Sequence, residues 1–283
     1  MTTTDLPRTA RVREAVDRRF GFLDTLGDQI LFFLRAIAWT PRALHRYLRE
    51  VVRLLAEVSF GSGALAVIGG TVGVIAAMSF FTGTEVGLQG FAALDQLGIA
   101  SYSGFISAFF NTREIAPLVA GLALSATVGC GFTAQLGAMR ISEEIDALEV
   151  MAVPSLPFLV TTRIVAGFIA VIPLYVIGLL SSYFATYVIL VYYFDQSAGT
   201  YSHYFHLFLP PGDVVWSFFK VLVFSVVIVL THCYFGYTAK GGPAGVGVAV
   251  GRAVRTAIVA VTLVDFFLSL AIWGSTTSVR LAG

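Results

Sequence analysis

Charged residues are scarce in this sequence of 283 residues, where Asp, Glu, Lys and Arg together make up only 12%. Soluble globular proteins carry about 25% charged residues, so the composition excludes an ordinary soluble domain. The hydrophobic residues, at 57% of the chain, gather in long runs without charge. The sequence therefore indicates a membrane protein, and a formal net charge of +1 provides no overall field that would attract nucleic acid.

Cysteine and lysine are also rare, with two residues of each. Cys130 and Cys233 lie inside apolar segments, where a thiol usually acts as a small buried hydrophobic group. Lys220 precedes Val and Lys240 precedes Gly, whereas a P-loop needs Lys followed by Ser or Thr. The glycine-rich segment 241–247 is therefore no P-loop. The first twenty residues carry five Arg and no apolar stretch, which predicts that no cleavable signal peptide is present.

Charge-free runs predict five transmembrane helices. A hydrocarbon core of about 30 Å requires roughly 20 apolar residues per helix, and lipid tolerates no unsatisfied backbone groups. No charged residue occurs in four runs, which lie between Glu57 and Glu85, between Glu114 and Arg140, between Arg163 and Asp195, and between Lys220 and Lys240. A fifth run, from about 256 to 274, contains only Asp265. We expect Asp265 to face the bundle interior, either as a structural hydrogen-bonding group or as a proton relay.

The distribution of Lys and Arg predicts the orientation of these spans. Counting from a cytoplasmic N-terminus, fifteen of the eighteen Lys and Arg lie on the inner side, where cytoplasmic loops retain positive charge. Arg113, Lys220 and Arg280 then lie outside, and residues 277–283 form a short external tail. The stretch 94–110 would invert the later spans if it crossed the membrane, and its Ser and Gly content favours a re-entrant or outer-surface helix.

Residues 1–56 form a predicted cytoplasmic N-terminus with an amphipathic segment. From about 20 to 55, apolar residues are mixed with Arg, six of which lie from Arg19 to Arg53, and this is typical of an interfacial helix whose Arg side chains reach anionic headgroups. Pro41 is expected to bend or divide this helix. A tilted span over residues 30–44 is the alternative. The remaining transmembrane domain is predicted over residues 57–276.

Small residues recur every four positions along the second predicted span. Such a face lets a second helix backbone approach closely in lipid. Ordinary packing within the bundle and a tight interface that moves during function are both compatible with it. The residues of this face are Gly121, Ser125, Gly129, Thr133 and Gly137.

The segment between spans two and three is acidic and amphipathic. Ile141, Ile145, Leu148 and Ala152 share one face at helical spacing, and we expect Ser142 to cap the helix. An acidic helix is not attracted to an anionic membrane surface, so it is either a solvated surface helix or a docking element for a cytoplasmic protein. The candidate contact residues are Arg140, Ser142, Glu143, Glu144, Asp146, Leu148, Glu149 and Met151.

Several of these segments together resemble the MlaE/YrbE permeases, the membrane subunits of ABC lipid transporters that work with MCE-domain proteins. The resemblance rests on residues 111–117 (NTREIAP), on residues 135–154 with their Glu-rich helix ending in MAVP, on Gly236-Tyr237, and on residues 263–266 (LVDF). It extends over roughly residues 63–274.

The resemblance implies an all-α membrane fold: an elbow helix, five spans and an acidic coupling helix that contacts a separate ATPase. ATP and Mg would bind to that ATPase and not to this chain. It also implies paired permeases that enclose a lipid path in the plasma membrane, with MCE-domain proteins on the outer face. Arg113, Glu114 and Pro117 would lie near the outer end of that path.

One departure from the family pattern concerns the composition of the pair. Family members commonly have an Arg where this chain has residues 127–131 (TVGCG). This suggests a heterodimer with a more typical copy, in which this chain resembles the B-type YrbE subunit; a homodimer remains the alternative.

The function expected from this resemblance is the import of fatty acids or related lipids through half of a translocation pore. No catalytic or metal-binding constellation is apparent in the sequence. Two other functions stay open: an ion-coupled secondary transporter, and a membrane scaffold that does not transport.

Overall fold

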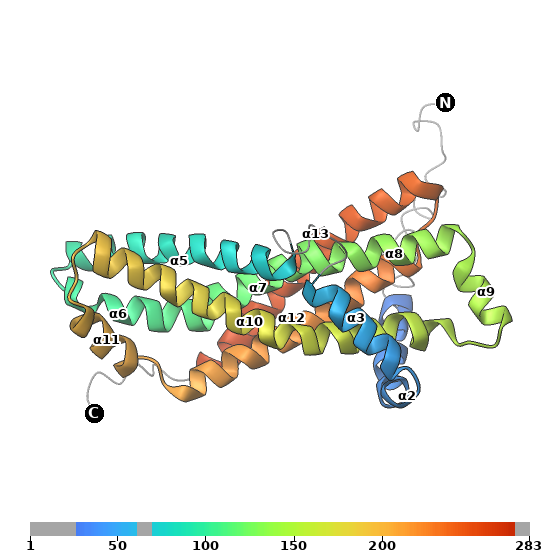
Figure 1. Cartoon of the computed structure of the whole chain (residues 1–283), viewed down its shortest axis with the longest axis horizontal. Coiled ribbons are helices and arrows are strands. Elements are labelled where there is room, and N and C mark those ends of the chain that lie inside the picture. The colour runs from blue at the N-terminus through green and yellow to red at the C-terminus, as the bar shows by residue number, and fades with distance from the viewer. Residues whose placement is uncertain (1–26, 61–69, 275–283) are drawn as a thin grey trace, which may run out of the picture.

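A computed structural model describes residues 27–60 and 70–274, and within these ranges the chain is helical and contains no strand. The helices run side by side along the long axis of an elongated bundle (Figure 1). Helices α6 and α11 lie at one end of the bundle, and α2 and α9 lie at the other (Figure 1). The predicted all-α membrane fold is confirmed.

Within the described ranges, five helical runs are long and apolar enough to cross a membrane, as the sequence predicted. Their bounds are Thr71–Gln96, Ala100–Ile141, Pro157–Tyr193, Pro211–Tyr237 and Gly242–Trp273. The first is α5 (Thr71–Gln96), the fourth is α12 (Pro211–Tyr237) and the fifth is α13 (Gly242–Trp273). The third joins η4 (Pro157–Thr161), α10 (Thr162–Val188) and η5 (Ile189–Tyr193).

The second span is one helical run of 42 residues, from Ala100 to Ile141. At 1.5 Å per residue it is about 63 Å long, twice the thickness of a hydrocarbon core. Two of its segments, η2 and η3, are π-helical, a feature frequent at functional sites. Its segments are η1 (Ala100–Tyr102), α6 (Ser103–Ile106), η2 (Ser107–Ile115), α7 (Ala116–Leu124), η3 (Ser125–Gly129) and α8 (Cys130–Ile141).

This run corrects the prediction for residues 94–110. The chain turns at Leu97 to Ile99, with Gly98 at φ 72°, and then enters the second span directly. Residues 94–96 end α5 and residues 100–110 begin the second helical run, so no separate helix forms there. The reason is tertiary packing: Tyr201 of α11 (Ala198–Leu207) donates a hydrogen bond to Ser107 Oγ at 2.9 Å, which holds the start of the span against α11. The position of residues 100–110 relative to the membrane surface stays a prediction.

The position of the first span also differs from the prediction. Helix α3 (Leu48–Phe60) continues past Glu57, and the span covers Thr71–Gln96 instead of the run between Glu57 and Glu85. Glu85 therefore lies within α5, on its exposed side. The helix buries the opposite face, which includes Ile75, Ser79 and Gly83. That buried face positions α5, and Glu85 points away from it.

The described part of the N-terminal segment, residues 27–60, is divided into three helical pieces. Residues 27–38 are helical, Trp39 interrupts them, and α2 (Thr40–Arg46) follows with Pro41 in its first turn. The helical conformation is interrupted again at Tyr47, before α3 begins. A continuous span over residues 30–44 is therefore absent. The interfacial position of the segment and the domain division at 56/57 stay predictions, and residues 1–26 and 277–283 lie outside the described ranges.

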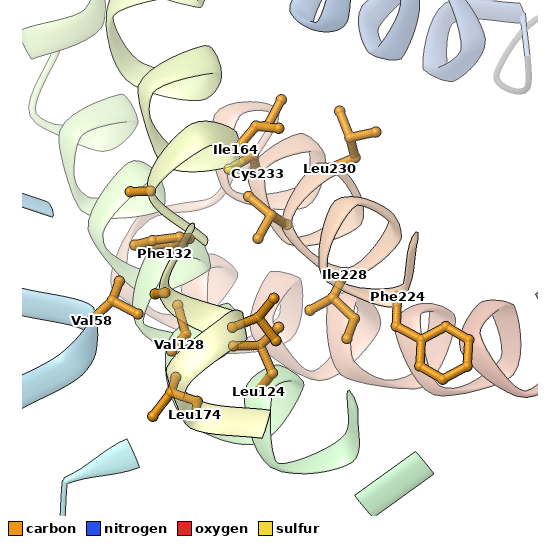
Figure 2. Packing of buried hydrophobic residues seen from close by; sticks show 14 of the residues in the cluster. Val58, Leu124, Val128, Phe132, Ile164, Leu174, Phe224, Ile228, Leu230 and Cys233 are labelled. Carbon is orange, nitrogen blue, oxygen red and sulfur yellow. The ribbon is translucent and has the colours of Figure 1, made fainter. Parts of the chain in front are cut away.

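Helix α10 lies at the centre of the bundle and packs against α3, α5, α7 and α12. Its Leu174 belongs to a buried apolar cluster with Leu124 and Phe132 of the second span and Ile228 of α12 (Figure 2). Large apolar side chains such as Phe81 and Phe267 are more than 60% exposed on the outside of the bundle. Large apolar side chains on the outside are expected where lipid or a partner, and not water, surrounds the bundle.

Candidate functional site

A fully buried lysine is the centre of a charged cluster between three spans. Lys220 of α12 is 0% exposed. Its Nζ donates hydrogen bonds to the carbonyl oxygen of Arg113 at 2.7 Å, to Ser269 Oγ at 2.8 Å and to Glu114 Oε2 at 3.3 Å. These three bonds use all three protons of the ammonium group.

Asp265 of α13 supplies the shortest ion pair of this lysine. Its Oδ1 lies 2.7 Å from Lys220 Nζ, and the residue is 7% exposed. This contact is the closest of the charged contacts of Lys220, shorter than its 3.3 Å contact with Glu114 Oε2. Ser269 also donates to Glu114 Oε1 at 2.8 Å. The carboxylates of Glu114 and Asp265 thus share one cation.

Arg113 forms the second half of the cluster. Its Nε and Nη2 lie 2.7 and 2.6 Å from Asp213 Oδ2, near the start of α12. The other oxygen of Asp213 accepts a hydrogen bond from Trp273 Nε1 at 2.9 Å. The guanidinium also lies 4.1 Å from the centre of the Phe109 ring. Arg113 and Glu114 are adjacent in sequence yet bind different partners, as expected for helical neighbours about 100° apart.

The cluster brings two cations and three carboxylates into the bundle, a formal charge of −1 if all are ionised. An isolated charge within a membrane is costly, so such groups pair with one another and mark functional sites. Arg113 is 7% exposed, whereas the Glu114 side chain is 35% exposed. Glu114 is therefore the member that a molecule outside the bundle can reach. Pro117 is buried in the first turn of α7, just after the cluster.

Sequence reasoning missed two members of this cluster. Lys220 was assigned to the outer surface, and Asp213 was not singled out. The sequence does contain a signal for Lys220. This lysine lies beside the charge-free run of α12, and Asp265 lies within the apolar run of the next helix, so each is an isolated charge next to long apolar stretches. Opposite charges in two neighbouring spans predict a pair, but only the helix packing shows that Asp213 faces Arg113 and not Lys220.

The face of small residues lies against α12 and α13 of the same chain. A Cβ atom at Gly129 would be 2.6 Å from the His232 ring, and one at Gly137 would be 2.8 Å from Val246. Gly121 faces Phe224 and Val261. These positions therefore permit a close helix contact within the protomer, and a movement at this contact stays a prediction.

The two hydroxyl residues of that face bind one histidine, which the sequence did not indicate as a site. His232 is 0% exposed, with Nε2 at 2.9 Å from Ser125 Oγ and Nδ1 at 2.8 Å from Thr133 Oγ1. The Thr133 hydroxyl donates to a backbone carbonyl, of Gly129 at 3.2 Å or of His232 at 3.1 Å. It then accepts from Nδ1–H, and Ser125 donates to Nε2. A neutral imidazole satisfies this arrangement.

The acidic segment forms a short helix, α9 (Glu144–Val150), at the end of the bundle opposite to α6 and α11 (Figure 1). Its four carboxylates, on Glu143, Glu144, Asp146 and Glu149, belong to exposed residues. Arg140 Nη1 lies 2.7 Å from Asp146 Oδ1, and Glu149 Oε1 accepts a hydrogen bond from Ser155 at 2.6 Å. Glu144 Oε1 lies 2.9 Å from Ser142 Oγ, and within the described residues the Glu143 carboxylate takes part in no hydrogen bond or ion pair.

Two details of this segment differ from the prediction. Ser142 does not cap the backbone of α9: Glu143, at φ 62°, precedes the helix, and the Ser142 hydroxyl lies within hydrogen-bonding distance of Glu144 Oε1 at 2.9 Å and of the Ala138 carbonyl oxygen at 3.0 Å. The predicted apolar face is also shorter, because the helix has seven residues and ends before Ala152. Ile145 is buried and Leu148 is half-buried, while Ile141, Ala152 and Met151 are exposed.

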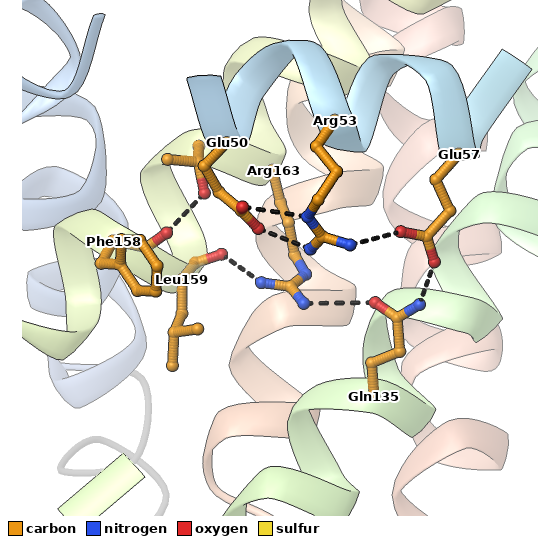
Figure 3. A network of polar contacts seen from close by, with 8 residues as sticks. Glu50, Arg53, Glu57, Gln135, Phe158, Leu159 and Arg163 are labelled. Atoms are coloured by element: carbon orange, nitrogen blue, oxygen red, sulfur yellow. Dashed lines mark hydrogen bonds and ion pairs between the residues drawn. The ribbon is translucent and has the colours of Figure 1, made fainter. Parts of the chain in front are cut away.

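A polar network joins the N-terminal helix α3 to the bundle near this end (Figure 3). The buried Arg163 of α10 donates to Gln135 Oε1 at 3.2 Å, and Gln135 donates to Glu57 Oε1 at 2.5 Å. Arg53 then bridges Glu57 and Glu50. Its hydrogen bonds hold the pKa of Glu50 below the usual value for a glutamate. The network fixes α3 on α8 and α10.

The geometry defines a class of protein: a multi-pass α-helical membrane protein with buried charges inside its spans and an exposed acidic helix at one end. Comparison with known proteins supports this class. The family Permease MlaE matches residues 60–271. A "Probable ABC transporter permease protein" of Rickettsia bellii is 30% identical over 252 residues, which cover 89% of this chain and 93% of the relative.

Other relatives extend the similarity to plants. A permease of the same description from Rickettsia felis is 28% identical over 89% of this chain and 93% of its own length. The Arabidopsis thaliana "Protein TRIGALACTOSYLDIACYLGLYCEROL 1, chloroplastic" is 30% identical over 70% of this chain and 57% of its own length. The chain belongs to the MlaE permease family. It is a membrane permease of the ABC type, a class that implies a separate ATPase and pairing of permeases.

Proposed function

We propose that this chain is one half of a lipid translocation pore in the plasma membrane, driven by a separate ATPase that binds ATP and Mg. In this proposal it pairs with a second YrbE-type permease as a heterodimer, receives fatty acids or related lipids from MCE-domain proteins on the outer face, and has a cytoplasmic N-terminus. A homodimer is the alternative assembly.

One observation carries the proposal. The continuous run Ala100–Ile141 holds Arg113 and Glu114 of the charged cluster near one end, and it leads into α9 through a turn of two residues at the other. A push on α9 is therefore transmitted along one helix to the cluster. Ser155, which follows α9, links that helix to α12, because its hydroxyl lies 2.6 Å from Glu149 Oε1 and 2.7 Å from Tyr237 Oη at the end of α12.

The cluster supports a role at the outer end of the lipid path. A lipid carboxylate or phosphate that approaches Glu114 would compete with this side chain for Lys220, because both anions seek the same ammonium group. The exposed part of Glu114 offers the approach, and movement of α7 or α12 would change the access to Lys220. In the proposal, ATP-driven movement of the spans changes the affinity of the cluster for the lipid headgroup.

The double substitution Glu144→Lys with Glu149→Lys tests the docking of the ATPase. The change reverses the charge of the exposed face of α9, so we expect recovery of the ATPase with the affinity-purified permease to fall at least about tenfold, the effect of roughly 1.4 kcal/mol. Membrane insertion is expected to stay unchanged. The measurement is the ratio of ATPase to permease after purification in mild detergent.

Asp28→Lys is the matched control, since Asp28 is an exposed carboxylate of the helical segment 27–38, outside α9. It should leave the ratio at the wild-type value. Full recovery of the ATPase with the α9 double variant would contradict the proposed coupling. Lipid movement in vesicles that lack any ATPase would contradict the ABC mechanism itself.

A further inference from the structure

A groove runs along the facing sides of α12 and α13, and the helical segment 27–38 closes it on the third side. Its wider part, the mouth, has a volume of about 460 Å³ and its narrower part, the recess, about 190 Å³. Gln29, Tyr234 and Phe235 line both parts, so the two adjoin. On α13 the lining residues proceed from Gly245 to Ala260, along one face of the helix.

The mouth is positively charged. Lys240 and Arg252 line it, together with Thr238 and Gln29, and none of the residues that line it is acidic. Both cations are exposed, and in the part of the chain that the structure describes neither takes part in an ion pair. Two cations that face one opening without a carboxylate between them attract an anion.

The recess is mainly apolar and lies deeper in the spans. Of the polar residues that line it, Thr231 donates its hydroxyl to the carbonyl of Val227 at 2.7 Å and so needs no partner from a ligand; the others are Gln29, Tyr234 and Thr256. Ala260 lies eight residues beyond Arg252, a rise of about 12 Å along α13. The remaining apolar side chains of the recess are Phe33, Val227, Leu230 and Phe235.

We propose that this groove binds one anionic phospholipid of the leaflet on the α9 side. The phosphate would lie between Lys240 and Arg252, and part of one acyl chain would enter the recess. The argument is complementarity, because a charged mouth joined to an apolar recess matches the two ends of an amphiphile, and basic residues beside a membrane attract anionic lipid. The phospholipid would join the segment 27–38 to α12 and α13.

This inference goes beyond the transport of lipid. The groove lies at the end of α12 opposite to Lys220 and Asp213, and its lining includes no residue of the charged cluster. The bound phospholipid is a resident ligand that fixes the N-terminal helix, and it need not be the transported molecule.

The double variant Lys240→Gln with Arg252→Gln tests the mouth. The full-length chain is placed in nanodiscs of phosphatidylcholine with or without 20% phosphatidylglycerol, and lipids that stay bound after transfer to detergent are counted by native mass spectrometry. Wild-type protein is expected to retain one phosphatidylglycerol in preference to phosphatidylcholine. Each lost cation should weaken this retention about fivefold.

Arg255→Gln is the control for general surface charge, since Arg255 is an exposed cation of the same helix that does not line the groove. It should keep the preference. Ala260→Phe is the second test, because it fills the recess without any change of charge, and it should lower retention of the same lipid. Circular dichroism verifies that each variant remains helical.

Three results would overturn the inference: equal retention of the two lipids by wild-type protein, an equal loss in Arg255→Gln, or unchanged lipid retention in the groove variants with loss of the ATPase. The last result would identify the groove as a protein contact. The ATPase ratio of the α9 variant is independent of the phospholipid count, so failure of this inference and failure of the proposed function are distinguishable.

Discussion

Lys220→Met is expected to give the largest loss of stability and of transport. The substitution removes the cation shared by Glu114 and Asp265 and leaves two carboxylates unpaired inside the bundle. Removal of one partner from a buried ion pair costs about 3–5 kcal/mol. We therefore expect a marked fall in the thermal unfolding midpoint of the purified protein, and loss of ATP-driven lipid transport in proteoliposomes that contain the ATPase.

A second variant separates stability from function at this site. Lys220→Met combined with Asp265→Leu replaces both members of the shortest ion pair with apolar groups, a change that is often neutral for stability. We expect the unfolding midpoint to recover in part while transport stays low, because the lipid headgroup has lost its cation. Wild-type midpoint and transport in the single variant would show that the cluster has neither role.

Gly83→Val is expected to disrupt the packing of α5 against α10. A Cβ at Gly83 would lie 2.5 Å from the carbonyl oxygen of Ser182 and 2.8 Å from its Cα. These are backbone atoms, so no side-chain rotation can relieve the overlap. Thr186 also donates to the carbonyl of Gly83 at 2.8 Å, a hydrogen bond that depends on the close approach. Overpacking of this kind costs typically 1–3 kcal/mol, and we expect the upper end of that range.

The measurement is the yield and unfolding midpoint of the detergent-purified protein, with Gly131→Val as the control. Gly131 is also a helical glycine of a span, but no atom lies within 4 Å of a Cβ built there. Its substitution should leave the midpoint within a few degrees of the wild-type value. If the two variants were equally stable, the close contact between α5 and α10 would be absent from the folded protein.

The prediction of the spans succeeded because hydrophobicity is a property of consecutive residues. The charge-free runs around α8, α10 and α12 are each long enough to cross a hydrocarbon core, whatever their neighbours are. The first span was placed too early in the sequence, because Glu85 was treated as the end of the run. A helix can carry a carboxylate on its exposed side within a span, and one-dimensional counting cannot show which side that is.

The acidic helix illustrates a similar limit. Its charges and its period were visible in the sequence, and the structure contains α9 where they predicted a helix. The start of the helix was misplaced, since Glu143 and not Ser142 precedes its first residue, and the Ser142 hydroxyl contacts the Ala138 carbonyl and the Glu144 carboxylate instead of a backbone N–H of α9. The residue with left-handed backbone conformation between the two helices is a glutamate and not a glycine. The residue type at this position therefore did not indicate a turn.

The sequence by itself determined that this protein is a helical, multi-pass membrane protein, because the cost of exposing backbone and charge to lipid acts on each segment alone, and its motifs carried the resemblance to a permease family. Only the tertiary structure decided that Lys220 binds Glu114 and Asp265, that Arg113 binds Asp213, and that His232 lies between Ser125 and Thr133. Those choices depend on the rotation and crossing of whole helices. These pairs join residues from 45 to 107 positions apart, which meet only after the spans have packed.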